Sequence, residues 1–161
     1  MKIQFPTIAI VGTGAMGRGI AQIAAQAGSQ VFLLDANPGA ADAAQAALQE
    51  QWNKLVAKGR IDATQASELV ARLHPVKAVA DLAGCDLVVE AIVERLDVKK
   101  ALFAELEAVV RPDAVLATNT SSLSVTAIGA GLQRPERLAG FHFFNPVPLM
   151  KVVEVIAGLK T

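Results

Sequence analysis

The stretch Ile8-Ala9-Ile10-Val11-Gly12-Thr13-Gly14-Ala15-Met16-Gly17 decides the fold of this chain. An apolar run leads directly into G-x-G-x-x-G, and helix-forming residues follow. A second apolar run, from Val31 to Leu34, ends at Asp35, which lies 18 residues after Gly17. This order of strand, glycines, helix and acid is the fingerprint of a dinucleotide-binding βαβ unit. The alternative is a glycine-rich turn beside an ordinary strand-end aspartate, and the matched spacing disfavours it.

Each position of the glycine turn has its own physical role. Gly12 allows the tight turn, Gly14 lets the backbone approach a pyrophosphate, and Gly17 lets the helix pack against the strand. The helix that begins near Ala15 and Met16 offers free N–H groups and the positive end of its dipole to an anion. We therefore expect these five residues to form the pyrophosphate part of a cofactor site.

The strand-end acid predicts which dinucleotide is bound. The Asp35 carboxylate can accept hydrogen bonds from both hydroxyls of an adenine ribose. A 2′-phosphate at roughly 4 Å would instead cost about 4 kcal/mol per charge pair at an effective dielectric near 20. Asn37 and Pro38 follow, and no Arg that could receive a phosphate stands between Asp35 and Arg60. The sequence therefore predicts NAD rather than NADP.

Length, charge and composition narrow the class of protein. The 161 residues fit one domain spanning 1–161. Fifteen basic and fifteen acidic side chains give a formal net charge of zero, and the basic residues form no stripe, so we expect no nucleic-acid partner. Apolar residues make up 53% of the chain. A parallel sheet covered on both faces explains part of that excess, and an exposed face made for a partner explains the rest.

The sequence also indicates a compartment. The single Cys85 excludes an intrachain disulfide and suits a reducing environment. Its apolar neighbours indicate a buried structural thiol rather than a reactive one. Residues 1–6 are too short and too polar for a signal peptide, and no apolar run reaches transmembrane length. We expect a cytoplasmic chain that contacts no membrane and holds no metal.

Alternating apolar runs and helical patterns predict an α/β fold of the Rossmann type, with a doubly wound, mainly parallel sheet. Residues 38–72 predict a helical hairpin inserted after the second strand. A buried strand is expected over Asp86–Ile92 and a short helix over Leu123–Ile128. The last two strands, Arg137–Phe144 and Lys151–Ile156, predict an antiparallel hairpin at the C-terminal end.

Two residues of that final hairpin form a candidate catalytic pair. His142 and Glu154 are equidistant from Pro148 at its turn, so their side chains are predicted to lie opposite one another on one face. A carboxylate against one ring nitrogen fixes the tautomer, and the other nitrogen can take a hydroxyl proton while hydride leaves for NAD. Such help is worth about 10²- to 10⁴-fold in rate. The alternative is a strand histidine satisfied by a neighbour, with Glu154 on a wet edge.

Polar residues follow two other strands, and each group has two interpretations. Ser121, like Thr120 before it, is either a helix cap or, through its hydroxyl, a ligand of the substrate oxygen. Glu90, Glu94 and Lys99 are either a solvated charged loop or part of a βα loop at the cofactor edge, where nicotinamide-ribose contacts occur.

Taken together, these segments resemble the 3-hydroxyacyl-CoA dehydrogenase family, specifically its N-terminal NAD-binding domain. Besides the glycine turn and Asp35, the matching segments are 86–94, 118–123 and 140–155. The likeness covers nearly the whole chain, and the last two segments are specific to this family. It implies NAD-dependent interconversion of an L-3-hydroxyacyl-CoA and a 3-ketoacyl-CoA.

The resemblance also implies roles for individual residues. His142 matches the family's catalytic base, Glu154 its carboxylate partner, and Ser121 a serine that contacts substrate and nicotinamide. The positions that match NAD contacts are Glu94, Lys99 and Asn145. The inserted helical hairpin matches an arm that meets the CoA moiety, and Lys54 or Lys58 is expected to reach its phosphates.

Family members continue into a helical C-terminal domain that closes the acyl site and carries a dimer interface. This domain is absent from the 161 residues, so we expect the isolated chain to bind NAD, to turn over weakly or not at all, and to expose an apolar partner face. The full-length form is expected to be a homodimer. Two other functions remain open: a dehydrogenase of a free hydroxy or sugar acid, and a non-catalytic NAD-binding module.

Overall fold

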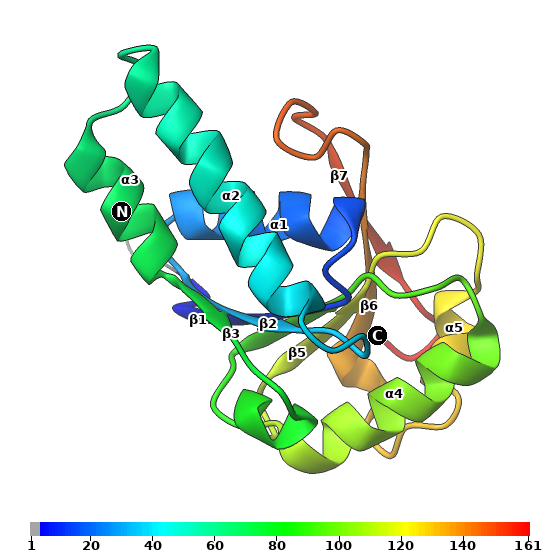
Figure 1. Cartoon of the computed structure of the whole chain (residues 1–161). Helices are drawn as coiled ribbons and strands as arrows, with labels where there is room; N and C mark the ends of the chain where they lie inside the picture. Colours follow the sequence, from blue (N-terminus) through cyan, green and yellow to red (C-terminus); the bar gives the residue numbers. More distant parts are fainter. Residues whose placement is uncertain (1–3) are drawn as a thin grey trace.

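A computed structural model describes residues 4–161, so residues 1–3 at the N-terminus lie outside the described part. One seven-stranded sheet with the order β3-β2-β1-β4-β5-β6-β7 forms the centre of the molecule (Figure 1). Strands β1 to β6 run parallel, and β7 pairs antiparallel with β6. The strands are β1 (Thr7–Val11), β2 (Gln30–Leu34), β3 (Leu73–Pro75), β4 (Leu87–Glu90), β5 (Val115–Thr118), β6 (Leu138–Phe143) and β7 (Val153–Ala157).

Helices cover both faces of this sheet. In Figure 1, α1, α2 and α3 lie on one side, and α4 and α5 lie on the other. The helices are α1 (Ala15–Gln26), α2 (Ala40–Ala57), α3 (Ala63–Ala71), α4 (Leu96–Val109) and α5 (Val125–Gly129), with short 3₁₀ turns η1 (Val79–Leu82) and η2 (Pro135–Arg137). The predicted doubly wound α/β fold and its antiparallel C-terminal hairpin are confirmed.

Strand β1 separates two cores because its side chains alternate between the faces of the sheet. Ile8 and Ile10 pack into one apolar cluster, which contains the fully buried Trp52 of α2. Ala9 and Val11 pack into the other, which contains Phe103 of α4. Burial on both faces explains why the central strands read as continuous apolar runs.

The predicted helical hairpin between β2 and β3 is confirmed as α2 and α3. The two helices stand side by side as an arm that reaches beyond the sheet (Figure 1). Asp62 caps α3 by accepting the N–H of Gln65, and the Gln65 side chain accepts the N–H of Asp62 in return. This reciprocal cap sets the point at which the second helix of the arm begins.

Two predicted boundaries are corrected. Strand β4 ends at Glu90 rather than Ile92, because the Glu90 carboxylate accepts the N–H of Ile92 at 2.7 Å and the chain turns there. The short helix begins at Val125 rather than Leu123, and its cap is Ser124, whose hydroxyl accepts the N–H of Ala127 at 3.2 Å. The helix-cap interpretation of Ser121 is therefore wrong.

Cys85 is buried, as predicted, and burial raises the pKa of its thiol to about 11. Such a thiol is protonated near neutral pH and a poor nucleophile. Among residues 4–161, the structure contains no helix with both the length and the apolar character needed to cross a membrane.

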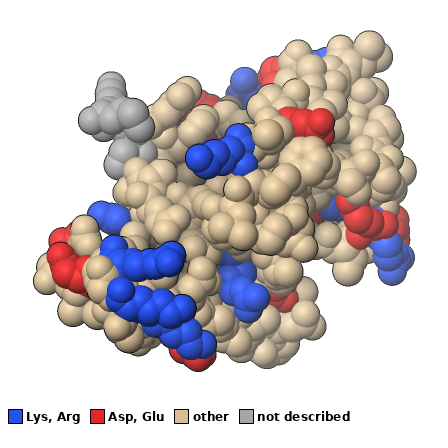
Figure 2. Space-filling view, turned by 90° about the horizontal axis from the view of Figure 1, so that it is seen from above, with Lys and Arg blue, Asp and Glu red and all other residues tan. Residues whose placement is uncertain are grey.

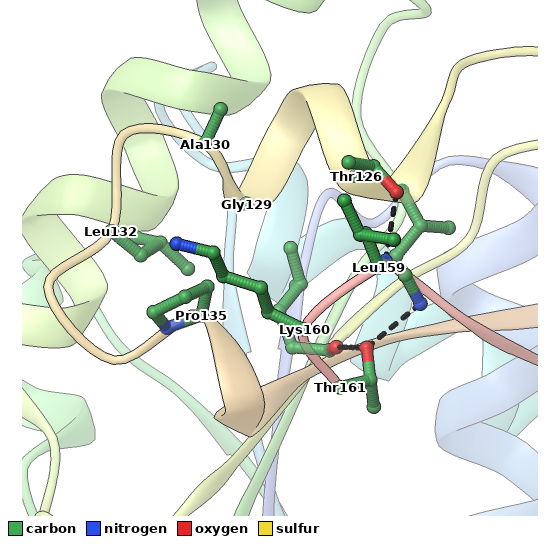
Figure 3. Close-up of a pocket in the computed structure, with 11 residues that line it drawn as sticks. Thr126, Gly129, Ala130, Leu132, Pro135, Leu159, Lys160 and Thr161 are labelled. Carbon is green, nitrogen blue, oxygen red and sulfur yellow. Dashed lines mark hydrogen bonds between the residues drawn. The ribbon is translucent and has the colours of Figure 1, made fainter.

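The last four residues fold back against α5 and the start of β6, around a cavity of about 180 Å³ (Figure 3). The N–H of Leu159 donates to the Thr126 hydroxyl at 2.9 Å, and the Thr161 hydroxyl donates to the Leu138 carbonyl at 2.6 Å. Because β7 runs antiparallel, this cavity lies at the amino end of the parallel strands. It is therefore separate from the site at their carboxyl ends.

Candidate active site

The carboxyl ends of β1, β4, β5 and β6 meet along one edge of the sheet. The strand order reverses between β1 and β4, because the chain builds outward to β3 on one side and to β6 on the other. Ligands of open α/β sheets bind in the crevice at such a switch point. The glycine turn follows β1, and the predicted residues Glu94, Ser121 and Asn145 follow β4, β5 and β6, with His142 near the end of β6 itself. The others lie elsewhere: Asp35 after the neighbouring β2, Lys99 in α4, Glu154 in β7, and Lys54 and Lys58 on the α2–α3 arm.

The glycine turn after β1 has the geometry that the sequence predicts. Gly12 has a φ of +93°, which L side chains rarely adopt. A Cβ on Gly17 would lie 1.8 Å from the Gly12 carbonyl oxygen, whereas a Cβ on Gly14 would meet nothing within 4 Å. Gly14 also provides no side-chain cap for α1, which begins at Ala15, so N–H groups there remain free for a ligand. This open backbone cradle at a helix N-terminus fits a pyrophosphate.

Asp35 lies one residue beyond β2 and is tied to that turn. Its Oδ2 accepts the backbone N–H of Thr13 at 2.7 Å and the Thr13 hydroxyl at 2.8 Å. Its Oδ1 accepts the N–H of Asn37 at 2.9 Å and the side-chain amide of Asn37 at 3.2 Å. Burial alone would raise the pKa of Asp35, but these hydrogen bonds outweigh it and hold the pKa below its ordinary 3.8.

These contacts fit an acid that holds a ribose. A carboxylate offers about four acceptor positions, and the amide of Asn37 makes the longest of its four bonds. That amide is the group a ribose hydroxyl would displace first. Asp35 and Asn37 also line a hollow of about 480 Å³ together with Pro38 and Val76. Sequence reasoning missed Thr13, which fixes the carboxylate, because the bond joins two strands through the fold.

A second hollow of about 340 Å³ brings together six residues from four segments of the chain. Its lining includes Met16, Glu94, Asn119, Ser121, His142 and Asn145. All of them except Asn119 are residues that the sequence predicts to contact cofactor or substrate. We call this hollow the central cleft.

The hairpin pair has the geometry predicted from the turn. His142 of β6 pairs directly with Glu154 of β7, and Nδ1 of the ring lies 2.8 Å from Oε2 of the carboxylate. Because a carboxylate only accepts hydrogen bonds, this contact selects the neutral tautomer with its proton on Nδ1, in which Nε2 is an acceptor. The His142 side chain is 19% exposed and lines the central cleft, whereas Glu154 is 55% exposed.

Two of the three charged residues at this edge are not solvated, so the interpretation as a solvated charged loop is wrong for Glu90 and Lys99. Glu90 and Lys99 have side chains that are 0% exposed, and the Lys99 ammonium donates to Oε1 of Glu90. The same ammonium lies 3.5 Å from Oε2 of Glu94, whose side chain is 40% exposed and reaches the central cleft. Lys99 therefore lies behind Glu94, and its contact with a cofactor stays a prediction.

Glu94 also holds the segment that carries the predicted substrate serine. Its Oε2 accepts the hydroxyl of Thr120 at 3.0 Å, and its Oε1 accepts the backbone N–H of Ser121 at 3.1 Å. The loop after β4 and the loop after β5 are thus joined at the cleft wall. Ser121 is placed in the cleft by these bonds rather than by a helix cap.

Asn119 is a further residue that sequence reasoning missed. It follows β5 directly, its N–H donates to the Glu90 carbonyl at 2.7 Å, and its Oδ1 accepts the N–H of Phe143 at 3.0 Å. One residue therefore connects β4 and β6 across the end of β5. A polar residue immediately after a buried strand was the available signal.

The lysines expected to reach CoA lie away from the cleft, on the arm. Lys54 lies in the last turn of α2 and forms an ion pair with Glu50 at 2.7 Å, with both side chains exposed. Lys58 caps the end of α2 and is exposed. Figure 2 shows basic side chains gathered at one corner of the face seen from above, with acidic side chains beside them and further charged groups scattered over the rest of that face. Contact with a phosphate stays a prediction for both lysines.

Comparisons with known proteins identify the same family that the sequence motifs resemble. The model of the family "3-hydroxyacyl-CoA dehydrogenase, NAD binding domain" matches residues 7–161. A 3-hydroxyadipyl-CoA dehydrogenase of Escherichia coli K12 is 48% identical over the whole chain, which covers 34% of that protein. A probable 3-hydroxybutyryl-CoA dehydrogenase of Deinococcus radiodurans is 44% identical over 94% of the chain, which covers 54% of that protein.

Among solved structures, a 3-hydroxybutyryl-CoA dehydrogenase from Escherichia coli K12 superimposes with a TM-score of 0.95 at 48% identity. That match covers 99% of this chain and 34% of the other. The chain therefore spans about a third to a half of the length of these relatives.

Proposed function

Because the chain belongs to the 3-hydroxyacyl-CoA dehydrogenase family through its NAD-binding domain, we propose that it supplies the cofactor site and the catalytic base of such an enzyme. The enzyme would interconvert an L-3-hydroxyacyl-CoA and the 3-ketoacyl-CoA. The observation that carries the proposal is the 2.8 Å contact between His142 and Glu154 at the central cleft. An imidazole fixed at this place would act as the base that removes the proton of a substrate hydroxyl group.

The residues divide the reaction between them. NAD⁺ held by the glycine turn and Asp35 would supply the acceptor for the hydride that leaves the hydroxyl carbon of the substrate. Nε2 of His142 takes the hydroxyl proton, so that the C–O single bond becomes a carbonyl and the two electrons leave with the hydride. Glu154 stabilises the imidazolium that forms, and Ser121 donates a hydrogen bond to the reacting oxygen. In the reverse direction, the imidazolium returns its proton to the oxygen.

The remaining sites would hold the two nucleotide-containing molecules. The glycine turn and Asp35 bind the pyrophosphate and adenosine ribose of NAD, while Glu94, Lys99 and Asn145 are assigned to its nicotinamide end. Lys54 and Lys58 on the arm are assigned to the phosphates of CoA, since ammonium groups on an exposed helix suit that anion.

We further propose that residues 1–161 form a single domain and that a helical region outside them completes the acyl site and a homodimer. The surface around β7 supports this, because it exposes large apolar side chains. They include Leu149, Val152, Val155 and Leu159, which are 55% to 83% exposed. Large exposed apolar side chains in such number are typical of a surface that a partner covers. A cytoplasmic role in fatty-acid β-oxidation fits this activity.

A CoA-dependence assay tests the substrate class. In the full-length protein, NADH formation is expected with L-3-hydroxybutyryl-CoA and not with free 3-hydroxybutyrate at the same concentration. Equal rates with the two would favour a dehydrogenase of free hydroxy acids instead. Calorimetric titration of the 161-residue chain is expected to give NAD⁺ binding without measurable binding of acetoacetyl-CoA.

A further inference from the structure

Glu90, Lys99 and Glu94 form a three-charge cluster in the wall of the central cleft, which we call the ion cluster. Two of its side chains are 0% exposed, and only Glu94 reaches the cleft. We propose that the net negative charge of the ion cluster makes the cleft favour the oxidised, cationic nicotinamide ring over the reduced, neutral ring. This inference rests on the proposed function, because it requires the nicotinamide end of NAD to lie beside Glu94.

The hydrogen bonds of the ion cluster define its charge. Glu90 accepts the N–H of Ile92 and the hydroxyl of Thr118, each at 2.7 Å, in addition to the Lys99 ammonium. Glu94 likewise accepts bonds from the loop after β5. Accepting from every partner is the behaviour of an ionised carboxylate. Two carboxylates and one ammonium leave one net negative charge.

Two of the three charged side chains are fully buried, where solvent screens them poorly, and the third is partly buried in the cleft wall. Lys99 is shared by two carboxylates, and its shorter contact is to Glu90, so Glu94 is only partly compensated. The bonds from α4, β5 and the loop after β4 prevent the groups from turning into solvent. NAD⁺ and NADH differ by one positive charge on the ring, and a fixed anion on the order of 10 Å away would separate their affinities by about tenfold.

A purely structural role for Glu90, or a pure contact role for Glu94, would give different behaviour. If Glu90 only supports the fold, its replacement would weaken binding of both cofactor forms equally. If Glu94 acts only by touching the cofactor, replacing the buried Glu90 behind it would leave the preference unchanged. The charge of Glu90 is therefore the discriminating variable, because that side chain is fully enclosed and does not reach the cleft.

The experiment measures, by calorimetry on the 161-residue chain, the ratio of the Kd for NAD⁺ to the Kd for NADH. Glu90→Gln and Glu94→Gln each bring the cluster to zero net charge and are expected to raise this ratio about tenfold. Glu90→Gln combined with Lys99→Met restores one net negative charge and is expected to return the ratio to within about twofold of the unmodified chain.

Two controls separate charge from geometry. Thr118→Val removes a hydrogen bond to Glu90 but no charge, and should leave the ratio unchanged. Glu105→Gln removes one negative charge from the exposed face of α4 and should also leave it unchanged, since solvent screens exposed charge. Thermal unfolding of every variant reports whether it folds.

The inference is overturned if the ratio of the two Kd values rises in Glu94→Gln but not in Glu90→Gln. It is also overturned if the ratio is unchanged in all variants. If Glu90→Gln does not fold, the combined variant decides. If the Kd ratio of the combined variant is shifted as far as that of Glu94→Gln, the charge mechanism is contradicted. If it stays near the ratio of the unmodified chain, the mechanism is supported. Absence of binding of either cofactor form to the unmodified chain would instead refute the proposed function.

Discussion

Strands β1 and β7 belong to one sheet but differ in how deeply they are buried. In β1, four of five residues are buried, and both neighbouring strands are parallel. In β7, all five residues are exposed, and β6 is its neighbour in the sheet. The glycine turn follows β1, whereas the partner of the candidate catalytic base lies on β7.

This difference distinguishes two parts of the site: the cofactor end, which this chain encloses, and the hairpin end, whose surroundings are exposed. The cofactor end is enclosed by helices on both faces and tied by the bonds of Asp35 to the turn. The hairpin end has the His142–Glu154 pair in register but exposes apolar side chains around it. We therefore expect the affinity for NAD to depend mainly on the β1 end and on the neighbouring ion cluster, and turnover to depend on the hairpin end as well. Substitutions at the two ends test that separation.

The largest effect is expected at the hairpin. In the full-length protein, His142→Gln should lower kcat by about 10²- to 10⁴-fold, because the base that takes the hydroxyl proton is lost. The Kd for NAD⁺ should stay within about twofold, since the β1 end is untouched. Steady-state kinetics and calorimetry measure the two quantities. Undiminished kcat would favour a non-catalytic NAD-binding module.

The next effect is expected at the glycine turn. Gly17→Ala places a methyl group 1.8 Å from the Gly12 carbonyl oxygen, so the helix must move away from the strand. Forced packing of this kind costs about 3 kcal/mol, or roughly 6–12 °C in Tm for a chain of this size. Calorimetry should show much weaker NAD⁺ binding. The control is Gly14→Ala, which should retain Tm, because its Cβ meets nothing within 4 Å, and lose affinity only.

A smaller effect is expected at Asp35. Asp35→Asn should raise the Kd for NAD⁺ about tenfold, since charge-assisted bonds to the ribose are lost, and should narrow the gap between NAD⁺ and NADP⁺. Because folding lowers the pKa of Asp35 below 3.8, its stabilising contribution is present above that value and is lost as pH falls through the folded pKa. Denaturant unfolding between pH 5 and pH 2 should show a shallower pH dependence in the variant. An identical pH dependence would contradict the assigned bonds.

The smallest effect is expected on the exposed strand. Val155→Thr in β7, where the side chain is 73% exposed, should change the free energy of unfolding by less than about 0.5 kcal/mol. It should leave the Kd for NAD⁺ unchanged and reduce self-association in sedimentation experiments. The matched control is Val88→Thr in β4, where the side chain is fully buried and an unpaired hydroxyl costs about 1–3 kcal/mol. A changed Kd in Val155→Thr would break the separation between the two ends.

Much of this architecture could be predicted because it follows from local rules. The glycine spacing specified the turn after β1, and alternation of apolar runs with helical patterns specified the parallel strands. The hairpin register could be predicted from the distance of His142 and Glu154 to the turn, because antiparallel pairing fixes opposite residues once the turn is placed. The boundaries of β4 and α5 could not, since they depend on side-chain hydrogen bonds of Glu90 and Ser124.

The buried charges were harder to predict, because Lys and Glu are almost never fully buried unless they are paired. One signal was available. Lys99 precedes Phe103 by four residues and Leu106 by seven, which places it on the apolar stripe of α4 that packs against the sheet. Its partner Glu90 stands on a different element, and the sequence alone did not pair them.

The bonds of Asn119 bear on how this scaffold can diversify. The two hydrogen bonds that join Asn119 to Glu90 and Phe143 go to main-chain groups, so this connection between the two strands does not depend on which side chains stand at those positions. Mutations that reshape the walls around His142 can therefore accumulate while the imidazole keeps its alignment. A lineage carrying this amide could acquire new substrates without first rebuilding its proton-transfer apparatus.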